Sequence, residues 1–258
     1  MKTLVTAIQK GGQGKTFVTC HLAFDFLEKN QKICVIDFDG QANTSYTLGE
    51  YAIGIPTVDL LKNKNAVEKN NLKEKIQNNK LVVFHATQEI ADLKMGMQDL
   101  ENCAENFKSN IKTLGESFDV CLIDTAPTLD AELLIALSAA DFMMSPIEME
   151  TFSLIGANNI LAIFKQIKKQ NPKLQFIGML PNKIDVRKPR QMAKIEELKR
   201  LYNKILMPFA VSNRDSFAEA MESKKPVWQI KKSSAKKAMK EIKAVAQYVF
   251  DTMATKSA

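Results

Sequence analysis

The chain carries glycines and two lysines close to its first residue, in the stretch TAIQKGGQGKT at positions 6–16. Lys15 is placed to reach the β- and γ-phosphates of a nucleotide, and the Thr16 hydroxyl is placed to bind Mg²⁺. The usual spacing G-x-x-x-x-G-K-[ST] is not met, because Gln9 stands at the first glycine position. The stretch still predicts a phosphate loop, and the spacing alone gives no role to Lys10. The glycines that would let the backbone wrap phosphates without Cβ interference are Gly11, Gly12 and Gly14.

Three acidic residues at the ends of apolar runs are candidates for the metal side of this site. Asp37 and Asp39 lie in CVIDFDGQAN, and Asp124 lies in VCLIDTAP. In open α/β sheets ligands bind beyond the carboxyl ends of the strands, so all three carboxylates are expected near the phosphate loop. Asp124 suits contact with Mg²⁺, directly or through water. A carboxylate at a strand end can instead cap the next helix, and for Asp37 this alternative stays open.

Short apolar segments rich in β-branched residues alternate with segments of helical spacing. The alternation predicts an α/β fold, a doubly wound, mostly parallel sheet flanked by helices. The phosphate loop would then join the first strand to the first helix, whose positive end favours an anion. The expected strands are Leu4–Ile8, Ile33–Phe38, Leu81–Phe84, Val120–Ile123, Phe142–Ile147, Phe176–Leu180 and Ile205–Val211. The expected helices include Phe17–Lys29, Leu129–Ala139 and Leu154–Lys169.

The 258 residues, 45% of them hydrophobic, are enough for one large domain, and no linker rich in Pro, Gly or Ser divides them. We therefore expect a single domain over 1–258. Its last helix, at about 233–253, carries an apolar stripe and is expected to dock on the body of the domain. The first strand begins within a few residues of Met1, so no DNA-reading domain is expected before it. Residues 62–80, rich in Lys and Asn, predict an exposed excursion.

No segment has the length of a membrane span or the build of a secretory signal, because the apolar runs are short and mostly end in a charge. We expect a cytoplasmic protein. Its cysteines show no C-x-x-C spacing, so buried thiols are expected rather than a metal or redox motif. They are Cys20, Cys34, Cys103 and Cys121.

The formal net charge of +7 is matched by a single stretch. Between Lys224 and Lys243, eight lysines outnumber one acid, Glu241. Such a concentration favours a surface that faces a polyanion, either nucleic acid or an anionic membrane. A solvated lysine-rich surface without a partner is the alternative, and composition leaves the choice open.

Together these motifs resemble those of the ParA/MinD family of deviant Walker-A ATPases. KGGQGKT resembles the family's phosphate loop, in which a signature lysine precedes the glycines. CVIDFDGQANTSYTLG resembles its second box, DVCLIDTAPTLDAELLIALSAADFMMSPIEMETFSLIGA its Walker-B and switch region, and RDSFAEAMESKKPV its late helix and turn. The resemblance covers the chain from Thr3 to about Phe250. It implies a P-loop NTPase that hydrolyses ATP to ADP and phosphate with Mg²⁺, slowly without a partner.

The resemblance also implies a role for Lys10. In this family two ATP-bound subunits form a sandwich, and the signature lysine crosses to the partner's phosphates. Lys10 would act in trans and Lys15 in cis, much as an arginine finger is supplied by another protein. Dimerisation then depends on ATP, and the nucleotide becomes a switch. Asp39 would orient or activate the attacking water, and Pro127 would belong to the switch that senses the γ-phosphate.

Three sets of site residues follow. The implied catalytic residues are Lys10, Lys15 and Asp39. The residues expected at the metal are Thr16, Asp39 and Asp124. The residues expected at ATP are Lys10, Gly11, Gly12, Gln13, Gly14, Lys15, Thr16, Phe17 and Asn182. Asn182, in PNKID, resembles a base-contacting position of the family and could read adenine, although an Asn there could equally form a turn.

The sequence departs from the family's pattern at three positions. Gln13 stands where valine is usual, Gly40 where the D-x-D-P-Q pattern has proline, and Ser223 where glycine is common. Gly40 lies beside Asp39, so the rate of hydrolysis is open.

The basic stretch and the resemblance favour a ParA-like partition ATPase. As an ATP dimer it would bind DNA without sequence preference and be nucleoid-associated, with an affinity that falls steeply with salt. A ParB-like or other cargo-bound adaptor would stimulate hydrolysis, so that a plasmid, chromosome or other cargo is segregated or positioned. The residues expected to contact DNA are Arg214, Lys224, Lys225, Lys231, Lys232, Lys236 and Lys240.

Other hypotheses remain beside the partition ATPase. A MinD-like membrane switch would end in a basic amphipathic helix, but the tail DTMATKSA carries no bulky apolar cluster. An iron–sulfur relative would need a cysteine where Ala131 stands, and dethiobiotin-type synthetases lack the signature lysine. A protein that binds nucleotide and polymerises or docks without turnover also remains.

Overall fold

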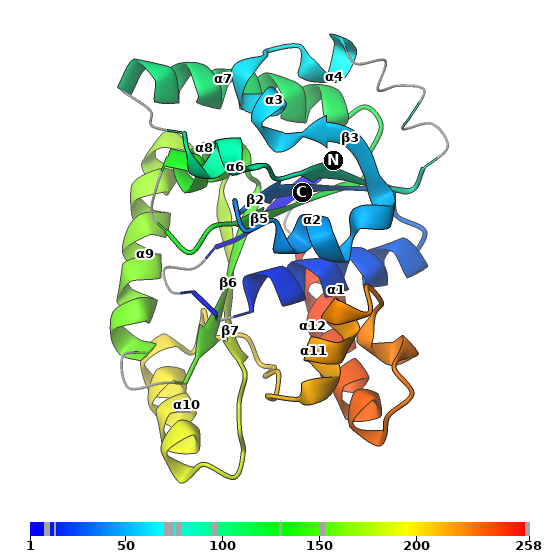
Figure 1. Ribbon diagram of the computed structural model, residues 1–258. Coiled ribbons are helices and arrows are strands. Elements are labelled where there is room, and N and C mark those ends of the chain that lie inside the picture. The colour runs from blue at the N-terminus through cyan, green and yellow to red at the C-terminus, as the bar shows by residue number, and fades with distance from the viewer. Residues whose placement is uncertain are drawn as a thin grey trace.

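The structure is a computed structural model that describes residues 1–7, 11–12, 14–69, 75, 79–93, 97–128, 131–149 and 153–255. Within these residues, seven strands form one parallel sheet in the order β3-β4-β2-β5-β1-β6-β7 (Figure 1). The doubly wound α/β fold is therefore confirmed. The strands are β1 (Lys2–Thr6), β2 (Ile33–Phe38), β3 (Ala52–Pro56), β4 (Leu81–His85), β5 (Val120–Thr125), β6 (Phe142–Glu148) and β7 (Gln175–Asn182).

Helices cover both faces of the sheet. One apolar core lies between the sheet and α3, α4, α7, α8 and α9, and a second lies between the sheet and α1, α11 and α12. The helices are α1 (Lys15–Glu28), α2 (Asn43–Thr47), α3 (Thr57–Lys62), α4 (Ala66–Lys69), α6 (Gln88–Ala91), α7 (Met97–Leu114), α8 (Ala131–Ala139), α9 (Ser153–Gln170), α10 (Pro189–Tyr202), α11 (Asp215–Glu222) and α12 (Ser233–Thr255). Two short 3₁₀ helices are η1 (Gly49–Tyr51) and η2 (Val227–Gln229).

The strand register brings the predicted site residues to one level. β1 lies between β5 and β6, and β2 lies on the other side of β5. Asp124 on β5 pairs in register with Thr6 on β1 and with Asp37 on β2. Because parallel strands end at the same edge, the loops after β1, β2 and β5 meet there.

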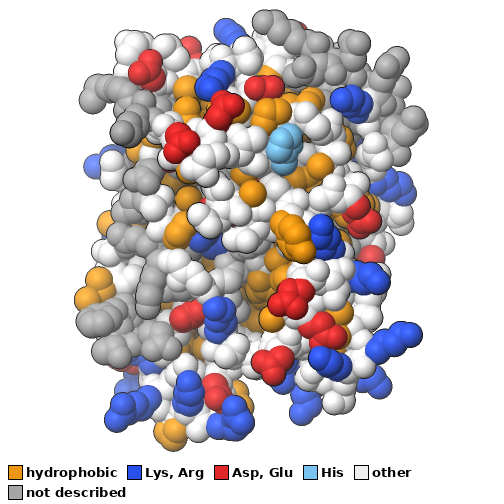
Figure 2. All heavy atoms as spheres, viewed as in Figure 1, with side chains coloured by type: hydrophobic (Ala, Val, Ile, Leu, Met, Phe, Trp, Pro, Cys, Tyr) orange, Lys and Arg blue, Asp and Glu red, His pale blue; other side chains and the backbone are white. Residues whose placement is uncertain are grey.

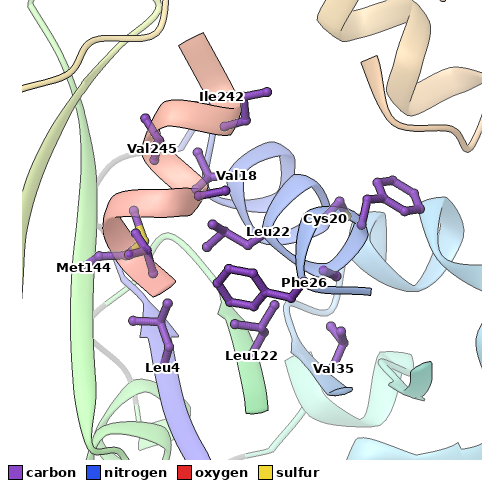
Figure 3. Close-up of a cluster of buried hydrophobic side chains, with 14 of the residues drawn as sticks. Leu4, Val18, Cys20, Leu22, Phe26, Val35, Leu122, Met144, Ile242 and Val245 are labelled. Atoms are coloured by element: carbon purple, nitrogen blue, oxygen red, sulfur yellow. The ribbon is translucent and has the colours of Figure 1, made fainter. Parts of the chain in front are cut away.

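The second core fixes α1, the helix that follows the phosphate loop. Leu22 and Phe26 of α1 point at Leu4 and Leu122 of the sheet, and α12 closes the cluster with Ile242 (Figure 3). All five side chains are essentially inaccessible to solvent. α1 ends at Glu28, and Asn30 turns the chain in a left-handed conformation, with φ 59°, as asparagine does at helix ends.

One expected strand was wrong, and one strand was missed. Ile205–Val211 is no strand: it runs beside β7 through isolated bridges such as Met179–Leu206. Pro208, which has no N–H to donate, interrupts the ladder there. β3 was not expected; it is short, and Gly54 within it has a φ of 76°. Of the expected excursion at 62–80, Ala66 and Val67 are buried rather than exposed, and 70–74 and 76–78 lie outside the described residues.

The cysteines behave as expected for thiols inside a fold. All four are free; Cys20, Cys34 and Cys121 are buried, and Cys103 is half-buried. Among the helices of the described residues, none combines the length and the apolar character that crossing a membrane requires.

Candidate functional site

The phosphate loop joins β1 to α1, and two of its glycines adopt conformations that residues with a Cβ rarely reach. Gly12 and Gly14 have φ of 79° and 88°. α1 begins at Lys15, directly after the loop, so the unpaired N–H groups and the positive end of the helix lie at the site. This arrangement is that of an anion-binding helix start. The expected site residues Lys10 and Gln13 lie outside the described residues.

Asp124 meets two hydroxyl groups at the carboxyl end of β5. The hydroxyls of Thr16 and Thr44 donate to the same carboxylate oxygen, Oδ2, at 2.7 Å and 2.8 Å. The other oxygen, Oδ1, is buried and has no hydrogen-bond partner among the described residues. Burial raises the pKa of Asp124 to about 6, against the effects of the two threonine hydrogen bonds and of the Lys15 charge.

This arrangement fits Mg²⁺ together with a phosphate ligand. An unsatisfied, buried carboxylate oxygen beside the Thr16 hydroxyl suits a hard cation or one of its waters. No group of three or more His, Cys, Asp or Glu in the described part of the chain could hold a metal. A bound Mg²⁺ would take further ligands from phosphate oxygens and water, which is how Mg²⁺ is usually held in nucleotide sites.

Asp37 and Asp39 both follow from β2, but their surroundings differ. Asp37 is fully buried; its Oδ2 accepts hydrogen bonds from the N–H and the hydroxyl of Ser45 in α2, at 2.8 Å and 2.6 Å. Its Oδ1 accepts the N–H of Asp39 at 3.0 Å. Burial, and then the charge of Asp124, raise the pKa of Asp37 to about 7. The Asp37 carboxylate therefore fixes the backbone of Asp39 and the start of α2 through hydrogen bonds. This favours the alternative in which Asp37 caps the helix that follows β2.

A cavity of about 570 Å³ opens over the phosphate loop. Its volume is within the range of small-molecule sites, about 300–1,000 Å³. Asn182, at the end of β7, packs behind Gly14 at its edge. A larger hollow of about 950 Å³ lies around Met1 and Lys173, beside residues that precede β1 and β6 rather than at the phosphate loop. The cavity is lined by Gly11, Gly12, Gly14, Lys15, Thr16, Phe17, Asp39, Gln41, Asn43, Tyr46, Thr47, Pro127, Lys183, Met221 and Glu222.

Lys15 is the buried cation of this cavity, with 5% of its surface exposed. Burial lowers the pKa of Lys15, and the charges of Asp124 and Asp39 act in the opposite direction. A phosphate group placed here would add negative charge next to a partly desolvated ammonium and stabilise its charged form. Asp39, 8% exposed, offers a carboxylate to the same cavity, and its Oδ1 accepts the N–H of Gln41 at 3.0 Å.

Four of the expected DNA-contacting residues form an exposed lysine cluster around η2 and the start of α12. Figure 2 shows Lys and Arg side chains along the lower part of this face, where Figure 1 draws α10, α11 and α12. All four side chains are exposed, and none takes part in an ion pair with a described residue. The cluster consists of Lys225, Lys231, Lys236 and Lys240.

The other three expected DNA contacts differ from this cluster because each has a partner within the protein. Arg214 is half-buried and donates to Glu241 at 2.6 Å. Lys232 forms an ion pair with Glu219. The Lys224 ammonium lies 4.0 Å from the centre of the Tyr46 ring, at the rim of the cavity. These cations are already engaged within the protein, which the sequence does not reveal.

Several site residues were not expected from the sequence. Thr44 and Ser45 organise the carboxylates from α2, and Tyr46 and Lys183 line the cavity. The run NTSYT shortly after Asp39, which is rich in hydroxyl groups, could have pointed to Thr44, Ser45 and Tyr46 as site residues. Lys183 could have been recognised as a site residue from its position directly after Asn182, at the end of a strand.

The chain is similar to known proteins both in sequence and in fold. A family model described as an AAA domain matches residues 1–176. Protein IncC of Escherichia coli is 46% identical over 256 residues, which cover 98% of this chain and 70% of IncC. The chromosome partitioning protein ParA of Myxococcus xanthus is 25% identical over 222 residues, 85% of this chain and 78% of that protein. The solved complex of a Cyanothece McdA variant with ATP shares the fold, with a TM-score of 0.78, 21% identity and 96% of each chain covered.

Proposed function

Because the chain belongs to the ParA/MinD family of ATPases, we propose that residues 1–258 form a single ParA-like partition ATPase domain. It hydrolyses ATP with Mg²⁺, dimerises when ATP is bound, and binds DNA without sequence preference. A ParB-like or other cargo-bound adaptor stimulates hydrolysis and releases the dimer, which segregates or positions a plasmid, chromosome or other cargo. The observation that carries the proposal is the Thr16–Asp124 hydrogen bond beside the buried Lys15, at a cavity over a glycine loop.

Each of the expected site residues has its own part in hydrolysis. The glycine loop and Lys15 bind the phosphates and neutralise their charge. Thr16 and Asp124 hold Mg²⁺, which when bound neutralises charge on the phosphate oxygens. Asp39 orients the attacking water, and Lys10 reaches the nucleotide of the second subunit. Phe17, which lines the cavity, and Asn182, which touches the loop at Gly14, are the further residues proposed to contact the nucleotide.

Three observations support DNA rather than a membrane as the polyanion. The apolar stripe of α12 is buried in the second core through residues such as Ile242 and Val249. Insertion into a bilayer would have to remove that stripe from the core. The lysine cluster, in contrast, is exposed in the folded domain. One relative is named for chromosome partitioning, a process that acts on DNA.

The experiment that tests this proposal is binding of the full chain to random-sequence duplex DNA, with ATP and then with ADP, across a salt series. Tight binding with ATP alone, falling steeply with salt, is expected. The slope gives the number of phosphate contacts, at about 0.9 per contact. Binding with neither nucleotide, together with ATP-dependent binding to anionic vesicles, would favour the membrane switch instead.

A further inference from the structure

The end of β7 touches the phosphate loop at two of its glycines. The Asn182 amide lies directly behind Gly14, in the space that a Cβ there would need. The next residue, Lys183, donates a hydrogen bond from its ammonium to the carbonyl oxygen of Gly12. These contacts join segments 171 positions apart in sequence, and they make the end of β7 a support for the loop.

Lys183 has an unusual backbone conformation at the end of β7. Its φ of 53° is left-handed, a conformation uncommon for residues other than glycine, asparagine and aspartate. Such a conformation persists only where the surroundings hold it, and it concentrates at functional sites. The Glu148 carboxylate, at the end of the neighbouring strand β6, lies 3.2 Å from the Lys183 ammonium. Glu148 and Asn182 are partners in the β6–β7 register, so the sheet itself fixes this arrangement.

The contact has an electrostatic consequence for phosphate binding. A carbonyl oxygen in a phosphate loop carries partial negative charge and would repel a phosphate that it faced. The hydrogen bond from an ammonium engages the Gly12 carbonyl and offsets its charge. Gly12 has a φ of 79°, one of many backbone conformations that are open to glycine. A contact from outside the loop is therefore needed to hold this one conformation.

We propose that Lys183 is a positioning residue of the phosphate loop: it holds the Gly12 carbonyl, and Glu148 holds Lys183. This inference rests on the proposed nucleotide-binding function. Lys183 acts on the loop and not on a particular phosphate, which distinguishes it from Lys15. Its loss therefore weakens the binding of ADP and of ATP equally. A lysine in contact with the γ-phosphate would weaken ATP alone.

The test compares the full chain with Lys183→Met, which keeps an unbranched apolar side chain and removes the ammonium. The matched control is Lys188→Met, which removes an exposed lysine from the following loop. Titration with fluorescent ADP and ATP analogues is expected to give a Kd about tenfold higher for both nucleotides in Lys183→Met. The control should stay within about twofold of wild type. The KM for ATP should rise with the Kd.

Rescue separates loss of the ammonium from loss of the fold. Lys183→Cys should bind both nucleotides weakly, and aminoethylation of the new thiol, which restores an ammonium at nearly the same reach, should recover the affinity. Wild type treated in the same way controls for reaction at Cys103, the half-buried native thiol. A failure of aminoethylation to restore affinity would overturn the positioning role. Glu148→Gln should reproduce part of the loss for both nucleotides.

The outcomes distinguish this inference from the function on which it rests. Unchanged Kd values in Lys183→Met, with wild type binding both nucleotides, overturn the inference alone. A loss confined to ATP also overturns it, because it would show direct contact with the γ-phosphate. Wild-type protein that binds neither nucleotide overturns the proposed function and the inference with it.

Discussion

The amide of Asn182 occupies the space that a side chain at Gly14 would need, so β7 packs directly on the phosphate loop. Gly14 also has a φ of 88°, which disfavours any residue with a Cβ. Two independent constraints therefore require glycine at this position. Asn182 is 1% exposed and cannot move aside into solvent without a change in the end of β7.

Gly14→Ala is accordingly expected to lower the free energy of unfolding by about 1–3 kcal/mol and to weaken nucleotide binding at least tenfold. Urea unfolding and titration with a fluorescent ADP analogue measure the two effects. Gly49→Ala is the matched control, because a Cβ at Gly49 meets nothing within 4 Å. If Gly14→Ala left both quantities unchanged, the conclusion that Asn182 leaves no room for a side chain at position 14 would be wrong.

Lys10 and Lys15 are expected to separate dimerisation from nucleotide binding. Lys15→Ala removes the buried cation of the cavity, so affinity for both ADP and ATP should fall by about a hundredfold or more. Lys10→Ala should leave ADP affinity near wild type and prevent the ATP dimer, because the proposed contact of Lys10 is with the second subunit. Light scattering with ATP and with ADP measures the dimer. A Lys10→Ala protein that still dimerises with ATP would refute the trans role.

Asp124 is expected to carry the dependence of ATP binding on Mg²⁺. Its Oδ1 is buried without a hydrogen-bond partner in the described part of the chain, and a cation supplies what is missing. Chelation of Mg²⁺ should weaken ATP binding to wild type by about tenfold or more, and Asp124→Asn should bind ATP weakly with and without Mg²⁺. Asp251→Asn, on the exposed side of α12, is the control for the charge change. Isothermal titration at both conditions decides the matter; an Asp124→Asn protein with a normal Mg²⁺ response would exclude Asp124 from the metal site.

Most of the strands along the chain and the phosphate loop could be predicted because their signals are local. Buried parallel strands are apolar throughout, and Gly-Lys-Thr follows the first of them directly. Asp124 could be placed beside Thr16 because strand ends converge in such a sheet. Ile205–Val211 was wrong for a related reason: its apolar composition is that of a strand, but Pro208 denies it a continuous ladder.

The rest of the site depends on contacts between residues far apart in the sequence. Thr44 reaches Asp124 only because β2 and β5 are neighbours, and Lys183 reaches Gly12 only because β7 ends beside the loop. Charge counting found the basic stretch but could not show that Glu241 engages Arg214, or that Glu219 engages Lys232. Such pairings follow from the packing of α11 and α12, which no short sequence pattern encodes.

His21 is expected to make the fold sensitive to acid. Its Nδ1–H donates to the carbonyl of Phe17 at 2.9 Å, and its Nε2 accepts the N–H of Val227 at 3.1 Å, so the ring joins α1 to η2 as a neutral group. Burial lowers the pKa of His21 from 6.5 to about 4. Between these values the unfolded chain binds a proton that the folded one does not. The contribution of neutral His21 is therefore fully present above about pH 6.5 and is lost as the pH falls toward 4.

His21→Gln removes the titrating group and should make the free energy of unfolding less dependent on pH. The slope between about pH 6.5 and pH 4 should become shallower by up to about 1.4 kcal/mol per pH unit, the value for one proton. Urea unfolding at about pH 7, 6 and 5 gives the slopes for both proteins. Equal slopes for wild type and His21→Gln would mean that His21 titrates alike in the folded and unfolded states.

Glu241 is expected to keep Arg214 from contacting DNA, because the two residues form an ion pair. Its carboxylate accepts hydrogen bonds from the Ser212 N–H and hydroxyl, at 2.9 Å and 3.0 Å, and from the Arg214 guanidinium at 2.6 Å. Both partners of the Arg214–Glu241 pair are 23% exposed, so the pair lies at the surface and can be opened. Glu241→Gln keeps one acceptor oxygen and removes the charge that engages Arg214.

With ATP present, Glu241→Gln should therefore bind random-sequence duplex DNA more tightly and steepen the plot of log affinity against log salt by about 0.9, one more phosphate contact. Lys236→Ala, in the exposed lysine cluster, should make the plot shallower by about the same amount, whereas Arg214→Ala should change it less. Glu116→Gln, an equal charge change after α7, controls for net charge. Fluorescence anisotropy across a salt series measures all four slopes. If Arg214→Ala lowered the slope as much as Lys236→Ala, then Arg214 would contact DNA in spite of Glu241, and the ion pair would open on binding.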